Sequence, residues 1–251
     1  MRTVLSILCL ASAALSHADA LSKDELVQRM SVFGEGFLVR SIDAPVIDQP
    51  ARWIGRKSGD YVYRFTTGSD DGSPVQTERH IPNSDDPSRA WERHIGERLV
   101  ETFVSTDAED VLIVEEVDHQ HGFRMEIKPG IHWPPNVAAG DEWQIDAALN
   151  VYEIDSGEFF KDGTLKSTIT YEGAFRIRTP AGEFDAILMR EDFLMHIGPL
   201  QAEDDRFLFF AKDVGLVAEI EAIRASALLL LHIKEDSAKV LQSYPRQADP
   251  R

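Results

Sequence analysis

The chain reads LKSTITYEGAFRIR from Leu165 to Arg178, and this stretch decides its fold class. Apolar or small side chains occupy every second position from Leu165 through Ile169 to Ile177, and charged residues or threonines fill most of the positions between them. Successive side chains of a strand point to opposite faces of the sheet, so this period of two predicts a strand with one dry and one wet face.

Further strands are predicted on both sides of this stretch from their apolar, aromatic and β-branched content. They cover residues 60–66, 111–117, 123–128, 143–151, 184–191, 206–211, 216–224 and 225–234. Short turns join several of them, at Asp118–Gly122, Thr179–Gly182 and Lys212–Gly215. Consecutive strands without helical crossovers pair antiparallel. We therefore expect a mainly β fold, with an antiparallel curved sheet, a sandwich or a half-open barrel and one or two short helices, the first over Leu21–Ser31.

Residues 88–104 leave two interpretations open. Trp91, Ile95, Leu99 and Phe103 recur every four residues, as on one face of a helix, but Leu99–Val104 also reads as a strand.

Two other segments are expected to lack regular structure. Residues 32–52 contain Pro45 and Pro50, and residues 128–140 form a proline-rich linker.

The longest apolar run after the N-terminus, Ala225–Ile233, predicts a buried last strand.

The N-terminus has the three parts of a cleavable secretory signal peptide. Arg2 supplies positive charge, an apolar segment runs to Leu15, and Ala18-Asp19-Ala20 matches the peptidase site. The apolar segment is shorter than the roughly 20 residues of a membrane-spanning helix. We expect residues 1–20 to be removed, residues 21–245 to form a single β-rich domain and residues 246–251 to be a polar tail, in a protein that is periplasmic or secreted from a bacterium.

Composition narrows the possible functions. The formal net charge is −17, and losing Arg2 and Asp19 with the signal peptide leaves it unchanged. Such acidity disfavours binding to nucleic acid, whose phosphates attract Lys and Arg clusters. The chain has one cysteine, Cys9, inside the signal peptide, so the mature protein is expected to lack thiol catalysis, cysteine-bound zinc and disulfides. No membrane span is expected after cleavage.

Three stretches carry a resemblance to a known family. They are Pro135–Trp143, with a Gly-Asp-x-Trp ending, Thr179–Ala186, with Pro-Ala-Gly-x-Phe-Asp-Ala, and Phe209–Val217, with Val-Gly-Leu-Val. In this order they resemble the TapB-like exported proteins of bacteria and a related family of domains of unknown function, over about residues 130–224. The resemblance implies an exported, antiparallel β-rich domain and offers no catalytic residue. Its shared positions would be fold determinants, namely Gly140, Trp143, Gly182, Phe184, Gly215 and Leu216.

Metal binding has one weak pair of candidates. His119 and His121 would share a strand face, Glu116 or Asp118 would add a carboxylate, and His132 would be a third nitrogen ligand. The pair falls on a predicted hairpin tip, where solvated polar residues are the expected alternative.

No catalytic motif stands out. The sequence has no Gly-x-Ser-x-Gly elbow, no His-Glu-x-x-His and no glycine-rich phosphate loop. Carboxylates are abundant, and Glu191 with Asp192 is expected on a wet face or at a turn. The sequence therefore predicts no catalytic residue and no cofactor, which weighs against an enzyme.

Aromatic residues are the remaining lead. Trp53, Tyr61, Tyr63, Trp133 and Trp143 would either line the mouth of a curved sheet as a ligand site or fill the core. Three functions stay open: binding to a protein or envelope component, carriage of an apolar ligand such as a lipid, and hydrolysis of an unknown substrate. We rank them in that order.

Overall fold

The computed structural model describes residues 23–55, 57–68, 73–83, 90–106, 109–227 and 231–245, with the side chains of residues 227 and 231–233 left aside. The expected signal peptide and the expected polar tail lie outside the described residues. Within this part of the chain, no helix is long and apolar enough to cross a membrane.

Strands dominate the described residues, as predicted. They are β1 (Leu38–Ile42), β2 (Gly59–Thr67), β3 (Val75–Pro82), β4 (Ala90–Ile95), β5 (Leu99–Ser105), β6 (Val111–Asp118), β7 (Phe123–Trp133), β8 (Glu142–Glu153), β9 (Phe159–Thr179), β10 (Gly182–Ile197), β11 (Leu200–Ala211), β12 (Gly215–Ala227) and β13 (Leu231–Ser243). The helices are α1 (Lys23–Met30), the 3-10 turn η1 (Ser31–Phe33) and α2 (Ala51–Ile54).

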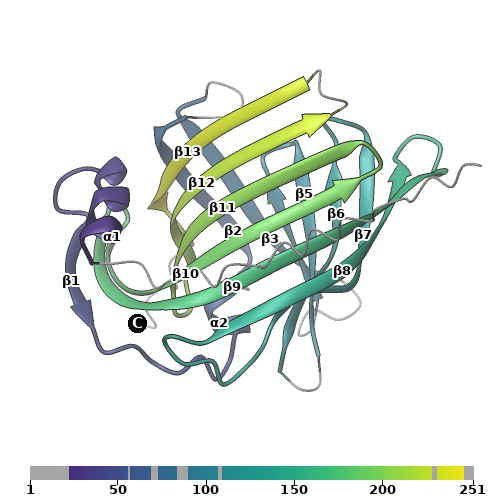
Figure 1. Ribbon diagram of the computed structural model, residues 1–251. Helices are drawn as coiled ribbons and strands as arrows, with labels where there is room; N and C mark the ends of the chain where they lie inside the picture. The colour runs from purple at the N-terminus through teal and green to yellow at the C-terminus, as the bar shows by residue number, and fades with distance from the viewer. Residues whose placement is uncertain are drawn as a thin grey trace, which may run out of the picture.

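The strands close into an antiparallel barrel. From β2 to β13 each strand pairs with the next along the chain, and β13 then pairs with β2, so twelve strands of the described residues form a ring. This is an up-and-down arrangement, in which closure leaves no unpaired edge. β1 adds outside the ring, against residues 174–177 of β9. The antiparallel β-rich prediction is confirmed, and the structure makes it a closed barrel rather than a sandwich or a half-open one (Figure 1).

Residues 90–104 are two strands and not a helix. Trp91 pairs with Phe103 and Ile95 pairs with Leu99 across the β4–β5 hairpin. A spacing of four is an even number, so it keeps residues on one face of a strand as well as on one face of a helix. The rings of Trp91 and Phe103 stack with centroids 5.2 Å apart.

Three other sequence expectations need correction. The run Ala225–Ile233 is not one strand, because β12 ends at Ala227 and β13 begins at Leu231. The linker expected from residue 128 begins later, because β7 continues to Trp133. Residues 32–52, expected to be irregular, contain β1 and α2. The strands are longer than their apolar patterns because charged residues occupy inward positions, as described below.

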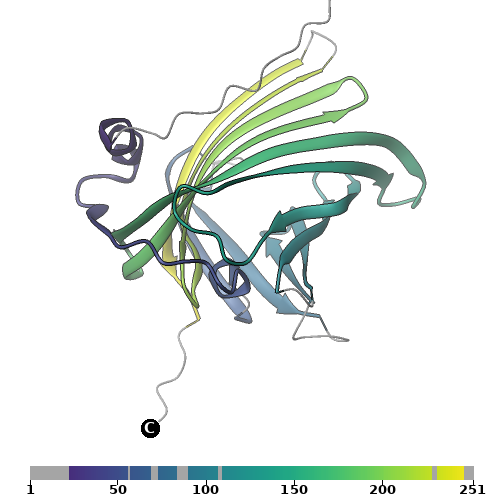
Figure 2. The ribbon, with the colours of Figure 1, turned by 60° about the horizontal axis from the view of Figure 1, so that its bottom comes forward.

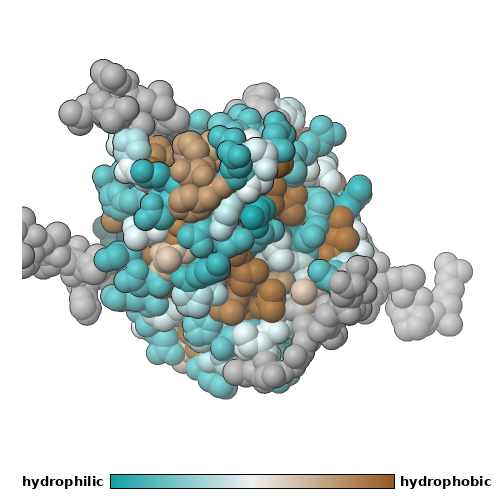
Figure 3. All heavy atoms as spheres, turned by 90° about the vertical axis from the view of Figure 1, so that its right-hand side faces the viewer, coloured by the Kyte–Doolittle hydropathy of each residue, from teal (hydrophilic) through white to brown (hydrophobic). Residues whose placement is uncertain are grey.

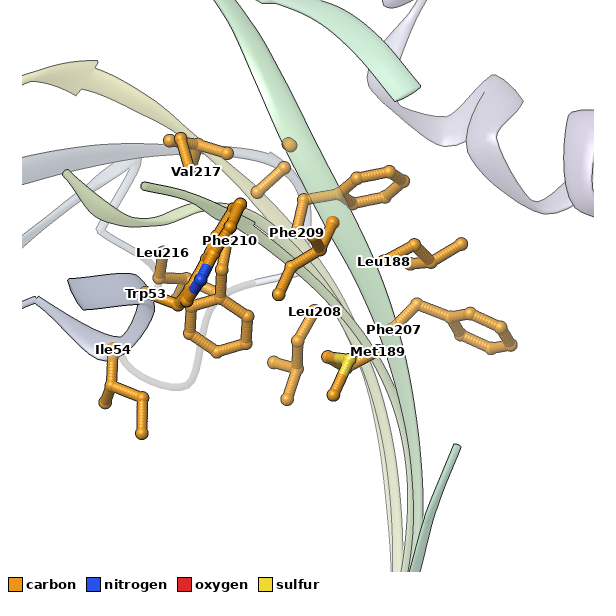
Figure 4. Packing of buried hydrophobic residues seen from close by; sticks show 14 of the residues in the cluster. Trp53, Ile54, Leu188, Met189, Phe207, Leu208, Phe209, Phe210, Leu216 and Val217 are labelled. Carbon is orange, nitrogen blue, oxygen red and sulfur yellow. The ribbon is translucent and has the colours of Figure 1, made fainter. Parts of the chain in front are cut away.

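One end of the barrel is filled by an apolar core. α2 lies against β11 and β12, and Trp53 and Ile54 pack with Leu208, Phe210 and Leu216 (Figure 4). All five side chains are buried.

The β11–β12 turn holds α2 in place. Arg52 forms an ion pair with Asp213, whose own N–H donates to the carbonyl of Arg52 at 2.6 Å. The short helix is therefore fixed by both backbone and side-chain contacts.

The outer face of the barrel is covered at one place by the N-terminal helices. The rings of Phe33 and Phe37 lie 6.4 and 5.4 Å from that of Phe209, edge-on. Arg29 of α1 also pairs with Asp205 at 3.1 Å. This explains why Phe209, which points away from the interior of the barrel, is fully buried. Figure 2 shows α1 beside the long strands and, across the interior, the blue and teal strands facing the green and yellow ones.

Gly215 gives the first testable prediction. Its φ is +100°, and a Cβ there would lie 3.3 Å from both the Cα of Gly55 and the carbonyl oxygen of Ile54. Gly215→Ala should therefore combine backbone strain with a clash and lower the free energy of unfolding by about 3 kcal/mol. Gly96→Ala is the control, because Gly96 has φ +58° and nothing within 4 Å of its Cβ position. It should cost about 1 kcal/mol. Equal losses in urea unfolding would contradict the proposed contact.

Candidate functional site

The barrel interior contains two neighbouring chambers. The first, of about 250 Å³, has mainly apolar walls, and we call it the apolar chamber. The second, of about 300 Å³, is lined mostly by charged side chains, and we call it the charged chamber. They share six lining residues, namely Arg93, Glu101, Glu116, Arg206, Glu219 and Ile223.

The apolar chamber lies on the core that α2 closes. Ile54 of α2 and Leu216 of β12 line it on that side, beside Trp133 of β7 and Phe210 of β11. Met125 and Phe193 belong to its wall farther along the barrel. These side chains come from strands that are distant in sequence, and ring closure brings them to one interior.

The charged chamber lies toward the opposite end, near the β4–β5 and β6–β7 hairpins. Arg98 and Asp118 at those hairpins line it, as does His121 in the second of the two turns. Lys239 of β13 and Glu221 of β12 line it from the other side of the barrel. A third depression, of about 540 Å³, is bordered by consecutive residues of β8, β9, β10 and β11. Most of its lining residues, such as Lys166, Asp192 and Glu203, alternate along their strands with inward-facing ones, so this depression lies mainly on the outer face of the sheet.

Three inward-facing cations, of which Lys239 is buried and Arg93 and Arg206 are partly buried, organise the interior charges. Arg93 pairs with Glu101. Arg206 pairs with Asp204 and, at 2.8 Å, with Glu221.

The third cation is Lys239. Its ammonium lies 2.9 Å from a carboxylate oxygen of Glu78 and 2.8 Å from one of Glu219. It also donates to the side-chain oxygen of Gln76 at 2.8 Å. One lysine thus joins β3, β12 and β13.

Carboxylates outnumber these cations. The apolar chamber is bordered by five inward-facing carboxylates, Glu101, Glu116, Glu191, Asp204 and Glu219, and by two guanidinium groups, Arg93 and Arg206, while the exposed Glu203 lies at its margin. Among the described residues, Glu116 has no hydrogen bond or ion pair. Glu191 accepts a hydrogen bond from the Ser167 hydroxyl at 3.0 Å. The carboxylates of this interior outnumber its cations, which favours bound protons or a bound cation.

Burial raises the pKa of several of these groups. Desolvation, with help from Glu101 and Asp118, raises the pKa of Glu116 to about 7, although Arg206 and Arg93 oppose the shift. Burial likewise raises the pKa of Glu221 to about 7. Protonation near neutral pH is the way in which an interior with too few cations lowers its electrostatic cost.

Burial shifts the pKa of two more carboxyl groups in the same direction. Burial raises the pKa of Glu191 and of Asp204, although Arg206 opposes both shifts. The pKa of Glu219 is lowered instead. Burial would raise it, but the nearby cations Lys239 and Arg206 together outweigh that effect.

The predicted aromatic residues divide between the chamber wall and the core. Trp133 lines the apolar chamber. Trp53, Tyr61 and Tyr63 are buried and line neither chamber, and the Tyr63 hydroxyl donates to the carbonyl of Leu216 at 2.9 Å. Trp143 is half-buried, and its indole N–H donates to the carbonyl of His132 at 2.8 Å.

The residues proposed as fold determinants lie at strand ends or in the core. Gly140, with φ +90°, precedes β8, while Gly182 and Gly215 begin β10 and β12 with φ of +141° and +100°. Phe184 is buried, with its ring edge-on to Tyr244. Leu216 lines the apolar chamber.

The histidine pair does not meet a third ligand. His121 bonds Asp118 at 2.7 Å in an exposed turn, whereas His132 pairs with Asp110 at 3.2 Å. Among the described residues, no group of three His, Cys, Asp or Glu side chains could hold a metal ion.

Sequence reasoning missed the interior charges. Glu219 and Glu221 alternate with Ala218, Ile220 and Ala222, which reads as a wet face. In the closed barrel it is the charged positions that point inward, as their pairs with Lys239 and Arg206 show. Glu191, expected on a wet face or at a turn, is likewise buried in the interior. A usable signal was the number of charged residues at alternate positions in strands that are otherwise strongly apolar.

Comparison with known proteins finds distant structural likenesses. No protein-family model matches the sequence, and no curated protein sequence matches it, so the TapB-like resemblance is not confirmed. An exported protein with a YmcC-like fold from Bacteroides fragilis has a TM-score of 0.45 and 11% identity, covering 77% of this chain and 99% of that one.

Two lipoproteins give lower scores. One from Parabacteroides distasonis has a TM-score of 0.39 and 13% identity, covering 80% of this chain and 99% of that one. The hypothetical lipoprotein YmcC from Escherichia coli has a TM-score of 0.38 and 9% identity, covering 88% and 98%. The proposals below rest on this chain's own residues.

Glu116 predicts a pH dependence of stability. Its folded pKa of about 7 lies above the usual 4.5, so the stability linked to its bound proton is present below pH 4.5 and is lost as the pH rises through 7. Glu116→Gln removes this loss. The variant should unfold at the same urea concentration as the unaltered protein at pH 4.5, and should be more stable by about 2 kcal/mol at pH 8.

Glu142→Gln is the matched control, because Glu142 is exposed at the beginning of β8. It should behave like the unaltered protein at both pH values. A Glu116→Gln variant that gains nothing at pH 8 would show that Glu116 is well solvated.

Lys239 gives a prediction about the ion pairs. Lys239→Met leaves Glu78 and Glu219 buried without their cation, which should lower the free energy of unfolding at pH 7 by about 3 kcal/mol. Lys234→Met is the control, since Lys234 forms an exposed pair with Asp236 at 3.1 Å. That change should cost less than about 1 kcal/mol. Comparable losses in the two variants would argue against a structural role for the buried network.

Proposed function

We propose that this protein binds a small amphipathic ligand inside its barrel, as a non-catalytic carrier or receptor outside the cytoplasm. The observation that carries the proposal is the apolar chamber with the charged chamber beside it, since the two share six lining residues. A ligand with an apolar part and a polar part fits this arrangement, because each part would meet matching side chains. Of the three functions left open by the sequence, this proposal takes up the second, carriage of an apolar ligand, and adds a polar part to that ligand.

The size and walls of the chambers support ligand binding. Volumes of about 250 and 300 Å³, joined through shared residues, are on the scale of small-molecule sites. The lining combines flexible Met125 and Met195 with the rings of Phe103, Trp133 and Phe210. Methionine side chains adapt their shape, which suits a site that must fit a flexible chain.

The outer surface favours an interior site over a protein-docking patch. Among the described residues, the large hydrophobic side chains that are exposed are spread over several elements, and Phe159 and Phe160 are neighbours. Seen from the right-hand side of Figure 1, hydrophobic residues form separate groups among hydrophilic ones (Figure 3).

The test uses native mass spectrometry of the protein purified from the periplasm without detergent. An extra mass that denaturation releases is the expected result. Met195→Trp places a bulky ring into the apolar chamber. The fraction of protein that carries the extra mass should fall by at least nine-tenths. His196→Trp is the control, because His196 is the exposed next residue of β10 and should leave ligand occupancy unchanged. A bare mass for the unaltered protein, together with no binding of added amphiphiles, would refute the proposal.

A further inference from the structure

The charge balance of the interior defines the polar end of the ligand. The three inward-facing cations are each already paired: Arg93 with Glu101, Arg206 with Asp204 and Glu221, and Lys239 with Glu78 and Glu219. Arg98, which lines the charged chamber at its hairpin end, also has an interaction of its own, so the cations of the two chambers are already engaged. A phosphate or carboxylate would add negative charge beside carboxylates that are already in excess, at a high desolvation cost.

Two carboxyl groups still have unused acceptors. Glu116 has no hydrogen bond or ion pair among the described residues, and it lines both chambers. Asp204 lines the apolar chamber with a side chain that is only 3% exposed, and its Oδ1 accepts no hydrogen bond. Glu116 is half-buried and Asp204 is buried, so a ligand that supplies N–H donors and positive charge would be stabilised beside these free acceptors.

The position of Glu116 orients such a ligand. In the β6–β7 pairing its partner is Met125, a wall residue of the apolar chamber. On its other side its partner is Glu101 of β5. Glu116 thus lies where the apolar chamber borders the charged chamber.

We propose that the ligand is an amphipathic amine, whose ammonium group binds Glu116 at the junction of the two chambers and whose apolar part lies along Met125 and Phe193. This inference rests on the proposed function and adds the chemical class of the ligand. The ammonium takes the place of the proton that Glu116 otherwise holds. Glu101 and Glu219 flank the same junction and add to the negative potential there.

Binding is then linked to pH. The charged groups that act on Glu116 are Glu101 of β5, Asp118 of its own strand, Arg93 of β4 and Arg206 of β11. Since burial raises the pKa of Glu116 to about 7, an ammonium ligand competes with its proton below that pH. Affinity should therefore rise as the pH increases from 5.5 to 8.

The test compares three probes with the same eight-carbon chain: octylamine, 1-octanol and octanoate. Isothermal titration at pH 8 should give octylamine at least tenfold tighter binding than octanoate, with octanol between them. Glu116→Gln should weaken octylamine at least tenfold and leave octanol unchanged. Glu142→Gln, with its exposed carboxyl, should bind all three like the unaltered protein.

The outcomes separate the two proposals. Failure of all three probes to bind would overturn the carrier function and this inference with it. If octanol and octanoate bind and octylamine binds no tighter, the carrier stands and the amine class is wrong. Unchanged octylamine binding by Glu116→Gln would also overturn the assignment of the ammonium site.

Discussion

Ring closure is the constraint on which the rest of this structure depends. The pairing of β13 with β2 and of β8 with β9 decides which face of every strand is inside. Once the ring is closed, the alternation of side chains leaves no choice, and charged residues at inward positions have to be balanced within the barrel. The ion pairs of Lys239, Arg206 and Arg93 follow from that requirement, and so do the raised pKa values of carboxyls that lack a cation.

The local part of the fold could be predicted from the sequence. The alternation over residues 165–178 and the turn at residues 179–182 gave the β9–β10 hairpin, because both signals come from neighbouring residues. Closure could not be predicted in this way, since the β13–β2 contact joins segments such as Leu241 and Tyr63 that are far apart in the chain. The spacing of Trp91, Ile95, Leu99 and Phe103 fits either element, and only cross-strand pairing decides between them.

The candidate site was less predictable than the fold. Of the aromatic residues proposed to line a ligand site, Trp133 lines the apolar chamber, while Tyr63 hydrogen-bonds the backbone within the core. The inward-facing charges of the charged chamber were not predicted. The sequence pattern of a strand such as β12 is the same whether its glutamates face water or the inside of a barrel. That distinction depends on which strands lie opposite. It is fixed by the tertiary structure, and the sequence signals it only through the number of charged residues at alternate positions of otherwise apolar strands.

The helix α2 has a consequence for the kinetics of exchange. Because α2 and the β11–β12 turn fill one end of the barrel, a ligand of the proposed kind would enter and leave toward the other end, where the charged chamber lies. Arg93, Glu101 and Glu219 line both chambers, so a hydrocarbon chain that moves between the two passes these polar side chains. On the proposed function, the residence time of the ligand is then set by these polar side chains as well as by the apolar contacts.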